Sequence, residues 1–499
     1  MANEGPKTGF ADPNTACPAR RLPAELLLDI WGMVPPLERV CASQVCSAWR
    51  RVSLASPWLW TQVIFLSAPW DPWTSRLWPN AAERSRWQQE AVCNGFDGFS
   101  KSKNAHFRNV FNPSPGTNNL ALFDELLPRS GQLPLDITVF PPDDHKDVKR
   151  LLSVLGKHAQ RISRLHFRYC FFPDIEVLLR ESGGSLPALR TLTAGFDNHI
   201  FVHEDKPPRI TDSEQFPALR QVHLGAEAAT WTLDWNSLGL DGIDYLTIVP
   251  HDDHNIIHAL SVCPNLSSLT LVMSALSSRY LIITEAVLAA LARVQSITVR
   301  GMHHKADDFV FALFDTARFS DLTFDCRGRA PWLDWVLPSP CRVLEQPVRL
   351  TVQLTDASYD VEVVDSAQRR RRILLDVGTV SKCPSLWGFW LREQEVSAAT
   401  VDARAWNYFT GGIPASTSIP ELTIAVRADP GELDTISLSK VSGLQQLHID
   451  VLASGLHFPR GAVSNLVRDA QLRVLSLAAD AAFDDAEELS ALAERLEFR

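Results

Sequence analysis

A histidine and aspartate cluster has residue types that could support chemistry. Residues 251–254 (HDDH) are consecutive, and His258 follows four positions after His254. Residues four apart share a helix face, so two imidazoles and nearby carboxylates could bind a divalent metal. A solvated turn before a helix explains the same residues without a metal, with the aspartates near the helix N-terminus. A metal-dependent enzyme at His251, His254 and His258 is therefore the less favoured alternative.

A run of four arginines, Arg369 to Arg372, follows the acidic residues Asp360, Glu362 and Asp365. One interpretation is a nuclear-import or acidic-partner patch. The simpler interpretation, which we predict, is a solvated helix start ahead of an apolar stretch, partly neutralised by those acids.

Motifs for catalysis are otherwise missing from the sequence. No glycine-rich phosphate loop follows an expected strand, and neither Gly-x-Ser-x-Gly nor His-Glu-x-x-His occurs. Nine cysteines are scattered without a Cys-x-x-Cys pair, which favours reduced and mostly buried thiols. We therefore predict no catalytic residue, no metal and no cofactor.

Composition limits the class of protein and its partners. The chain has 499 residues, of which 45 percent are hydrophobic and 21 percent charged, as in soluble globular proteins of more than one domain. The net charge of −10 argues against nucleic acid or an anionic membrane as a general partner. The first 20 residues lack an apolar segment of the signal-peptide kind, and no long apolar run follows. We expect a cytoplasmic and/or nuclear protein.

Residues 22–60 contain a dense pattern of helix signals. Pro23 favours a first helical turn, and Glu25 lies where a carboxylate meets the positive end of a helix. Leu26, Leu27 and Ile30 predict one apolar stripe that continues to about Trp31, and later apolar residues at three- and four-residue spacing predict a second and a third helix. Three such short helices have too little core to be stable alone, so an exposed apolar face is expected to meet a partner.

Three blocks in this region resemble the F-box motif. They are Leu22-Pro23-x-Glu25-Leu26-Leu27-x-x-Ile30, Val45-Cys46-x-x-Trp49-Arg50 and Pro57-Trp58-Leu59-Trp60, in the order and spacing of that family. The alternative is an ordinary three-helix cap whose stripes pack on the rest of the chain.

The resemblance implies a function in ubiquitylation. F-box proteins dock onto the Skp-type adaptor of a cullin and RING ubiquitin ligase and are not themselves enzymes, while their remaining domain captures a protein substrate. The residues that would form or support the adaptor-facing surface are Leu22, Pro23, Leu26, Leu27, Ile30, Val45, Cys46 and Trp49. Trp58 and Trp60 are expected to join the motif to the following domain.

The remaining chain divides into three further regions. Residues 1–20 are expected to be a disordered tail before an F-box at 21–66. Residues 67–132 form a tryptophan-rich connector, for which we predict a helix over 80–92 and a long polar loop over 93–118. Residues 133–499 then repeat a helix-like stretch followed by apolar-x-x-apolar-x-apolar.

The repeats predict an irregular leucine-rich-repeat-like solenoid, so the fold class is α+β or α/β. Most starts are separated by 23 to 33 residues, near the period of leucine-rich repeats. The starts are Ile162, Leu189, Leu219, Ile243, Leu266, Val294, Phe319, Pro347, Leu386, Ile419, Leu444 and Leu472. The alternative is an α/β domain whose strands share this pattern. A regular Asn or Cys after each strand, typical of the family, is absent.

Side chains between the apolar positions of each strand would share one concave surface. The possible substrate-binding residues on it are Arg164, His166, Arg168, His223, Arg300, Trp390 and Arg392. We therefore predict a substrate-recognition subunit of a Skp/cullin/F-box ligase with an unknown protein substrate. The rival is an adaptor-binding or free-standing repeat scaffold that promotes no ubiquitylation.

Overall fold

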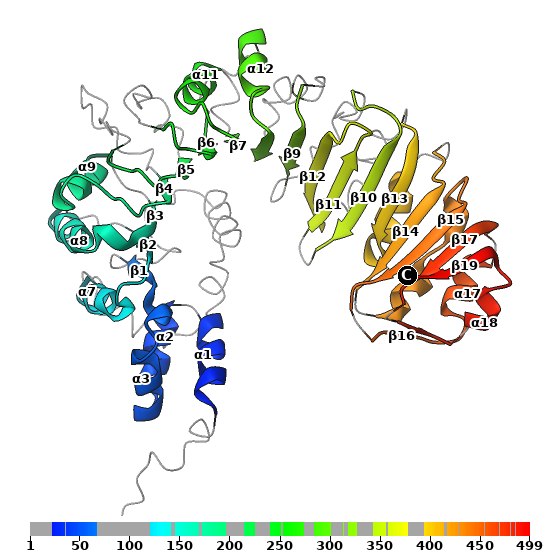
Figure 1. Cartoon of the computed structure of the whole chain (residues 1–499), viewed down its shortest axis with the longest axis horizontal. Helices are drawn as coiled ribbons and strands as arrows, with labels where there is room; N and C mark the ends of the chain where they lie inside the picture. The colour runs from blue at the N-terminus through cyan, green and yellow to red at the C-terminus, as the bar shows by residue number, and fades with distance from the viewer. Residues whose placement is uncertain are drawn as a thin grey trace, which may run out of the picture. The chain divides into compact units, whose positions relative to one another are not determined.

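The computed structural model describes most of the chain, in two compact units, Met1–Asp244 and Tyr245–Arg499 (Figure 1). The described residues are 22–34, 36–66, 120–140, 145–168, 172–195, 214–224, 240–250, 253–273, 284–300, 313, 318–326, 343–355, 358–377, 394–413, 417–427, 429–453, 455–468, 470–479, 481–484 and 486–499. The tail at 1–20, the helix predicted at 80–92, the loop at 93–118 and the repeat start at Leu386 lie outside them. In the part of the chain described, no helix has the length and apolarity needed to cross a membrane.

The first unit begins with three short helices, as expected. They are α1 (Ala24–Met33), α2 (Pro36–Ser43) and α3 (Ser47–Leu54), followed by the 3₁₀-helix η2 (Pro57–Trp60). Pro23 occupies the N-cap position of α1 rather than its first turn. The thiol of Cys46 caps α3 by accepting a hydrogen bond from the amide of Trp49 at 3.5 Å. Local capping and proline signals thus determine the helix ends.

A parallel sheet follows in the same unit. Its strands pair in the order β1 (Gln62–Leu66), β2 (Leu135–Phe140), β3 (Ile162–Arg168), β4 (Thr191–Gly195) and β5 (Gln221–Leu224). The helical segments between them are α7 (Leu120–Leu126), η3 (Leu127–Ser130), α8 (His145–Lys157), η4 (Ala159–Arg161) and α9 (Phe172–Glu181). Figure 1 shows α7, α8 and α9 along one side of the strands. The buried side chains in register, Val63, Ile137, Leu165, Leu192 and Val222, form the core beneath that side.

The second unit also begins with parallel strands. The strands β6 (Tyr245–Ile248), β7 (Ser268–Val272), β8 (Ser296–Arg300) and β9 (Asp321–Asp325) pair in sequence order, with α11 (Asp253–Val262) and α12 (Glu285–Leu291) between them. Leu246, Leu269, Ile297 and Leu322 lie in register and are fully buried. One face of this sheet is therefore apolar along its length, and the other carries serine, threonine and charged residues.

An antiparallel meander interrupts the parallel order. It comprises β10 (Val348–Leu354), β11 (Ser358–Val364) and β12 (Arg370–Asp376), of which β12 pairs in parallel with β9 and β10 pairs in parallel with β13 (Val396–Asp402). The arginine run is therefore the start of a strand, so the helix predicted there is wrong. The neighbouring acids do neutralise it, because Asp365, Glu362 and Asp360 pair with Arg369, Arg370 and Arg372.

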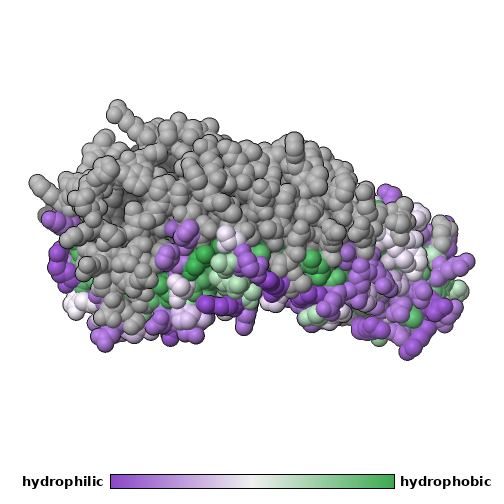
Figure 2. Space-filling model, turned by 90° about the horizontal axis from the view of Figure 1, so that it is seen from above, coloured by the Kyte–Doolittle hydropathy of each residue, from purple (hydrophilic) through white to green (hydrophobic). Residues whose placement is uncertain are grey.

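The last part of the second unit is parallel again. The strands β13, β14 (Glu421–Val426), β15 (Gln446–Val451), β17 (Leu472–Leu477) and β19 (Ala493–Phe498) pair in that order. Between them lie η9 (Ala403–Ala405), α16 (Trp406–Gly412), η10 (Pro430–Thr435), η11 (Leu438–Lys440), α17 (Ala462–Val467) and α18 (Ala486–Leu489), with the short pair β16 (His457–Phe458) and β18 (Ala482–Phe483). Figure 2 shows mainly hydrophilic residues on the visible surface at this end of the unit.

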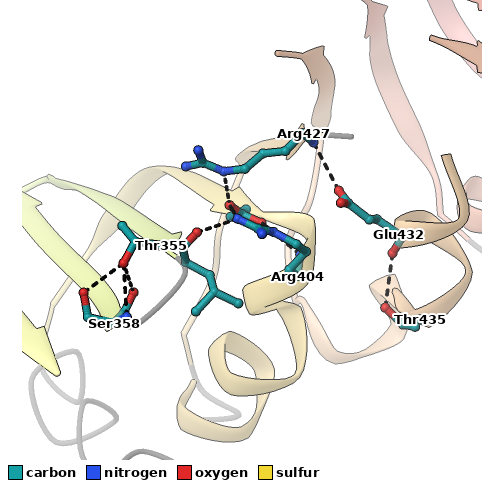
Figure 3. A network of polar contacts seen from close by, with 8 residues as sticks. Thr355, Ser358, Arg404, Arg427, Glu432 and Thr435 are labelled. Carbon is teal, nitrogen blue, oxygen red and sulfur yellow. Dashed lines mark hydrogen bonds and ion pairs between the residues drawn. The ribbon is translucent and has the colours of Figure 1, made fainter. Parts of the chain in front are cut away.

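A buried carboxylate connects the ends of β13 and β14. Asp402 is 1 percent exposed and accepts hydrogen bonds from Arg404 and Arg427, with Arg427 Nε at 2.5 Å from Oδ2 (Figure 3). Arg404 also donates to the carbonyl of Leu354 at the end of β10. Burial alone would raise the pKa of Asp402, but the hydrogen bonds from the two arginines outweigh it and hold the pKa below its usual value. Three strand ends thus share one ion-pair network.

Strands coincide with each predicted repeat start that lies in the described residues. Most begin two residues after the predicted position, for example β7 at Ser268 and β8 at Ser296. The repeat starts did not include β11, β12, β13 and β19. Strands β11 and β12 lack the apolar-x-x-apolar-x-apolar form, whereas β13 and β19 carry it with alanine at one apolar position. The fold is therefore a mixed α/β structure with mainly parallel strands in both units and a helical region at the start of the described residues.

Candidate functional site

An apolar stripe runs along the exposed side of α1. Leu26 is 50 percent exposed and Ile30 41 percent, and the stripe extends from Leu22 to Met33, which is 79 percent exposed. These residues recur at three- and four-residue spacing and therefore share one helix face. Apolar side chains this exposed and this close together on a small helical domain indicate a protein-interaction surface.

The opposite side of α1 supports the stripe, and Leu27 and Trp31, which were predicted to belong to the stripe, lie on this buried side instead. Leu27 and Trp31 are 4 and 1 percent exposed, and the Trp31 ring meets the Trp49 ring edge to face with centroids 5.5 Å apart. Trp49, on α3, is itself half-buried. This aromatic contact holds α1 against α3, so the orientation of the exposed stripe is determined by the core.

A second exposed apolar position lies at the turn between α2 and α3. Val45 is 58 percent exposed, whereas its neighbour Cys46 is 8 percent exposed and caps α3. Leu54, at the end of α3, is 47 percent exposed. Of the eight residues predicted for adaptor binding, Leu22, Pro23, Leu26, Ile30 and Val45 are thus exposed, Leu27 and Cys46 are buried and Trp49 is half-buried.

Arg39 of α2 ties these helices together. Its guanidinium donates hydrogen bonds to the carbonyl oxygens of Leu59 at 2.8 Å, Val34 at 2.8 Å and Gly32 at 3.3 Å. The residue is 6 percent exposed, and this burial lowers its pKa. One side chain therefore satisfies carbonyl groups at the end of α1, in the turn that follows it, and in η2.

The interaction surface is coupled to the sheet of its own unit. Trp60 is buried, donates from Nε1 to the carbonyl of Ser53 at 2.8 Å, and has the guanidinium carbon of Arg129 5.2 Å from its ring centroid. The amide of Asp136 in β2 donates to the carbonyl of Thr61 at 2.8 Å, directly before β1. Trp60 thus joins the helices to the following domain, as expected.

Trp58 was expected to join the two parts as well. Its described contact is instead within the helical region, where its ring lies 3.4 Å from the Cβ that a side chain at Gly32 would have. Trp58 is 43 percent exposed.

Polar side chains share one face of the sheet in the first unit. Asp136, Arg164 and His166 meet there, with Asp136 oxygens 3.7 Å from Arg164 Nη1 and 3.5 Å from His166 Nε2. His166 Nδ1 lies 2.9 Å from Thr193 Oγ1, and His223 stands opposite Thr193 on β5. The predicted positions Arg164, His166 and His223 therefore lie on one polar face, and Arg168 belongs to the same strand as the first two.

Arg300 lies on the polar face of the second unit. Its Nε is 3.2 Å from Asp325 Oδ2 on the next strand. Trp390 and Arg392 lie outside the described residues, so their placement stays a prediction. For Arg370 and Arg372, which share the Arg300 face, sequence reasoning favoured a solvated helix start over a nuclear-import or acidic-partner patch.

The histidine cluster does not form a metal centre in the part described. His254 and His258 are exposed residues of α11, and His251 is outside the described residues. Among the residues described, no group of three or more His, Cys, Asp or Glu side chains is arranged to hold a metal ion.

Residues 19–66 match the family model described as F-box-like. The helices, the exposed stripe and their supporting core lie inside this range. The chain therefore carries an F-box-like domain, a protein-interaction module that suggests binding to the adaptor of a Skp/cullin/F-box-type complex. No curated protein matches the chain.

Met33 and Leu54 are exposed apolar residues that sequence reasoning did not assign to this surface. Met33 continues the spacing of Leu26 and Ile30 by three residues, so periodicity contained a signal for it. Leu54 had no comparable signal, because its exposure depends on how α3 packs.

Proposed function

We propose that this chain is the substrate-recognition subunit of a Skp/cullin/F-box ubiquitin ligase. The observation that carries the proposal is the exposed stripe of Leu26, Ile30 and Met33 on α1, with Leu22 just before the helix, inside the F-box-like range. The stripe docks onto a Skp-type adaptor, and the adaptor connects the chain to a cullin scaffold. The chain performs no catalysis and raises the concentration of a bound substrate near a ubiquitin-conjugating enzyme.

The remaining strands form the substrate-binding part in this proposal, as a leucine-rich-repeat-like solenoid. The first unit has five successive parallel strands, with helical segments between them, and this arrangement supports the interpretation. Their polar face carries Arg164, His166 and His223 in the first unit, and Arg300 in the second, as candidate substrate contacts. Direct pairing of β1 with β2 couples the adaptor-binding domain to the strands of its unit, which would limit movement of a bound substrate relative to the adaptor.

The proposal is tested by separating adaptor binding from substrate capture. Leu26→Ala with Ile30→Ala removes exposed side chains, so the fold should persist while the adaptor is lost. Partner proteins would be isolated from cells that produce the wild type or this double variant. We expect the wild type and the double variant to bind the same substrate proteins. These proteins should be ubiquitylated and degraded only in cells that produce the wild type. A matched control is Leu452→Ala, an apolar residue 59 percent exposed in the second unit.

Two outcomes would contradict the proposal. If the double variant retains the adaptor at wild-type affinity, α1 is not the docking surface. If the adaptor binds but no captured protein is ubiquitylated, the chain is a scaffold rather than a substrate receptor.

A further inference from the structure

Arginine side chains gather on the polar face of the second unit, across β8 to β12. Arg300 and Asp325 are register partners on β8 and β9, and Asp321 is the register partner of Arg370 on β12. Residues directly opposite across strands share a face, as do alternate residues along one strand. Arg372, two residues from Arg370, therefore belongs to the same face.

Arg349 extends this set to β10. It stands opposite Val364 on β11, which in turn stands opposite Arg370. On its other side the register partner of Arg349 is Ala398 on β13. We call Arg300, Arg349, Arg370 and Arg372 the arginine comb.

The acids of this face lie deeper than the arginines. The side chains of Asp325, Asp360, Glu362 and Asp321 are 7, 13, 27 and 30 percent exposed. Those of Arg300, Arg370 and Arg372 are 46, 48 and 40 percent exposed, and Arg349 is also exposed. A partner approaching the face therefore meets guanidinium groups first.

The deeper acids orient the arginines and leave donors on them. Asp360 accepts from both Nε and Nη2 of Arg372, and the described pairs of Arg370 are loose, with Nε 3.4 Å from Glu362 and Nη1 3.7 Å from Asp321. A guanidinium has five N–H donors, so each of these pairs leaves others unused. Arg349 has no ion pair with any of the residues described.

The carboxylates themselves are poor sites for a cationic partner. Asp325 is almost completely buried and paired with Arg300. Burial raises the pKa of Asp321, and the nearby arginines oppose this effect only in part. The acids balance the charge of the arginines, but the guanidinium groups are the more exposed charged groups of this face and complement an anionic partner.

We propose that the arginine comb binds an acidic segment of a partner polypeptide through carboxylate-to-guanidinium contacts. Planar guanidinium groups whose orientation is already held by acids match carboxylates in two-point geometry. Each exposed pair contributes little alone, so binding requires several contacts along the comb. This inference names the substrate class and rests on the proposed substrate-receptor function.

The test uses the full chain purified with a Skp-type adaptor. Its probe is a fluorescein-labelled peptide of alternating glutamate and glycine, followed by fluorescence anisotropy at several salt concentrations. A peptide with glutamine in place of glutamate, and one with phosphoserine in place of glutamate, form the comparison arms. The variant is Arg349→Glu, because Arg349 is exposed and its replacement leaves no buried acid unpaired. Arg468→Glu, an exposed arginine at the end of α17, is the matched control.

We expect the glutamate peptide to bind in a salt-sensitive manner and the glutamine peptide not to bind. Arg349→Glu should weaken binding by roughly tenfold, since reversal replaces an attraction with a repulsion, and Arg468→Glu should not change it. The inference would be overturned if the glutamate peptide does not bind, or if Arg349→Glu leaves its affinity unchanged. It would also be overturned if only the phosphoserine peptide binds. Adaptor retention in the same samples shows separately whether the F-box-based function holds.

Discussion

The guanidinium carbon of Arg129 lies 5.2 Å from the centroid of the Trp60 ring. Arg129 belongs to η3, and Trp60 is the last residue of η2 in the F-box-like domain. The adjacent strands β1 and β2 pair in parallel over five residues, starting with Gln62 opposite Asp136. The helical domain and the first sheet therefore form one continuous packing unit, with an arginine and a tryptophan at the junction.

This contact should contribute measurably to stability. Arg129→Ala and Trp60→Leu, singly and together, form a double-mutant cycle, and we expect a coupling free energy of about 0.5 to 1 kcal/mol by chemical denaturation. Arg129 also forms an ion pair with Glu125, so Glu125→Ala measures separately what that ion pair contributes to the free energy of unfolding. A coupling free energy near zero would show that the ring and the guanidinium act independently.

Arg39 is expected to stabilise the F-box-like domain. Arg39→Met keeps the aliphatic stem but leaves three backbone carbonyls without their donor. We expect this change to lower the free energy of unfolding by about 2 to 4 kcal/mol. Hydrogen exchange of residues 22–60 would measure the local loss. Arg50→Met changes an exposed arginine of α3 and should leave exchange unaltered. Equal exchange in both variants would contradict the assigned role of Arg39.

Asp402 should make stability depend on pH. Its folded-state pKa lies below the unfolded value of about 3.9, so the ionised carboxylate stabilises the fold above that value. This stabilisation is lost as the pH falls through the folded-state pKa. We expect Asp402→Asn to cost about 1 to 3 kcal/mol at neutral pH, since its arginine partners are about one-third exposed, and the difference from wild type to shrink below about pH 4.

Denaturation at a series of pH values checks this expectation. Asp434→Asn alters an exposed aspartate of η10 and serves as the control. A cost of Asp402→Asn that stays constant down to the most acidic pH would show that the carboxylate charge is not what stabilises these strand ends.

Gln368 occupies a left-handed backbone conformation, with φ of 63°, in the turn between β11 and β12. Glycine adopts this conformation without the steric cost that a Cβ brings. We expect Gln368→Gly to stabilise the fold by about 0.5 to 1 kcal/mol in thermal unfolding. Ala367 lies in the same turn without a positive φ, so Ala367→Gly relieves no steric strain and should destabilise the fold. A destabilising Gln368→Gly together with a stabilising Ala367→Gly would contradict this expectation.

The F-box-like region could be predicted from the sequence because its signals are local. The spacing of Leu26 and Ile30 and the prolines at 23 and 57 determine helices within a few residues of each signal. Exposure is less local. Leu26 and Leu27 are adjacent leucines, yet one is 50 percent exposed and the other 4 percent, because α3 covers only one side of α1.

The meander could not be predicted for a related reason. The pairing of β9 with β12 joins Asp321 to Arg370, far apart in sequence, and no local pattern records it. Four consecutive arginines also conceal the alternation of a strand. Arg371 lies on the apolar face, 2 percent exposed, and its Nη1 donates to the carbonyl of Phe319 at 3.0 Å, a partner that sequence spacing does not indicate.

The most direct measurement is the equilibrium affinity of the full chain for a Skp-type adaptor, compared with that of the Leu26→Ala, Ile30→Ala variant. Both side chains are exposed in the chain alone, so their burial at the interface is expected to contribute about 2 to 4 kcal/mol together. We predict that the variant keeps its thermal stability and binds the adaptor roughly 30- to 700-fold more weakly, whereas Leu452→Ala binds as the wild type does. A folded variant with unchanged adaptor affinity would contradict the central claim that the α1 stripe is the docking surface.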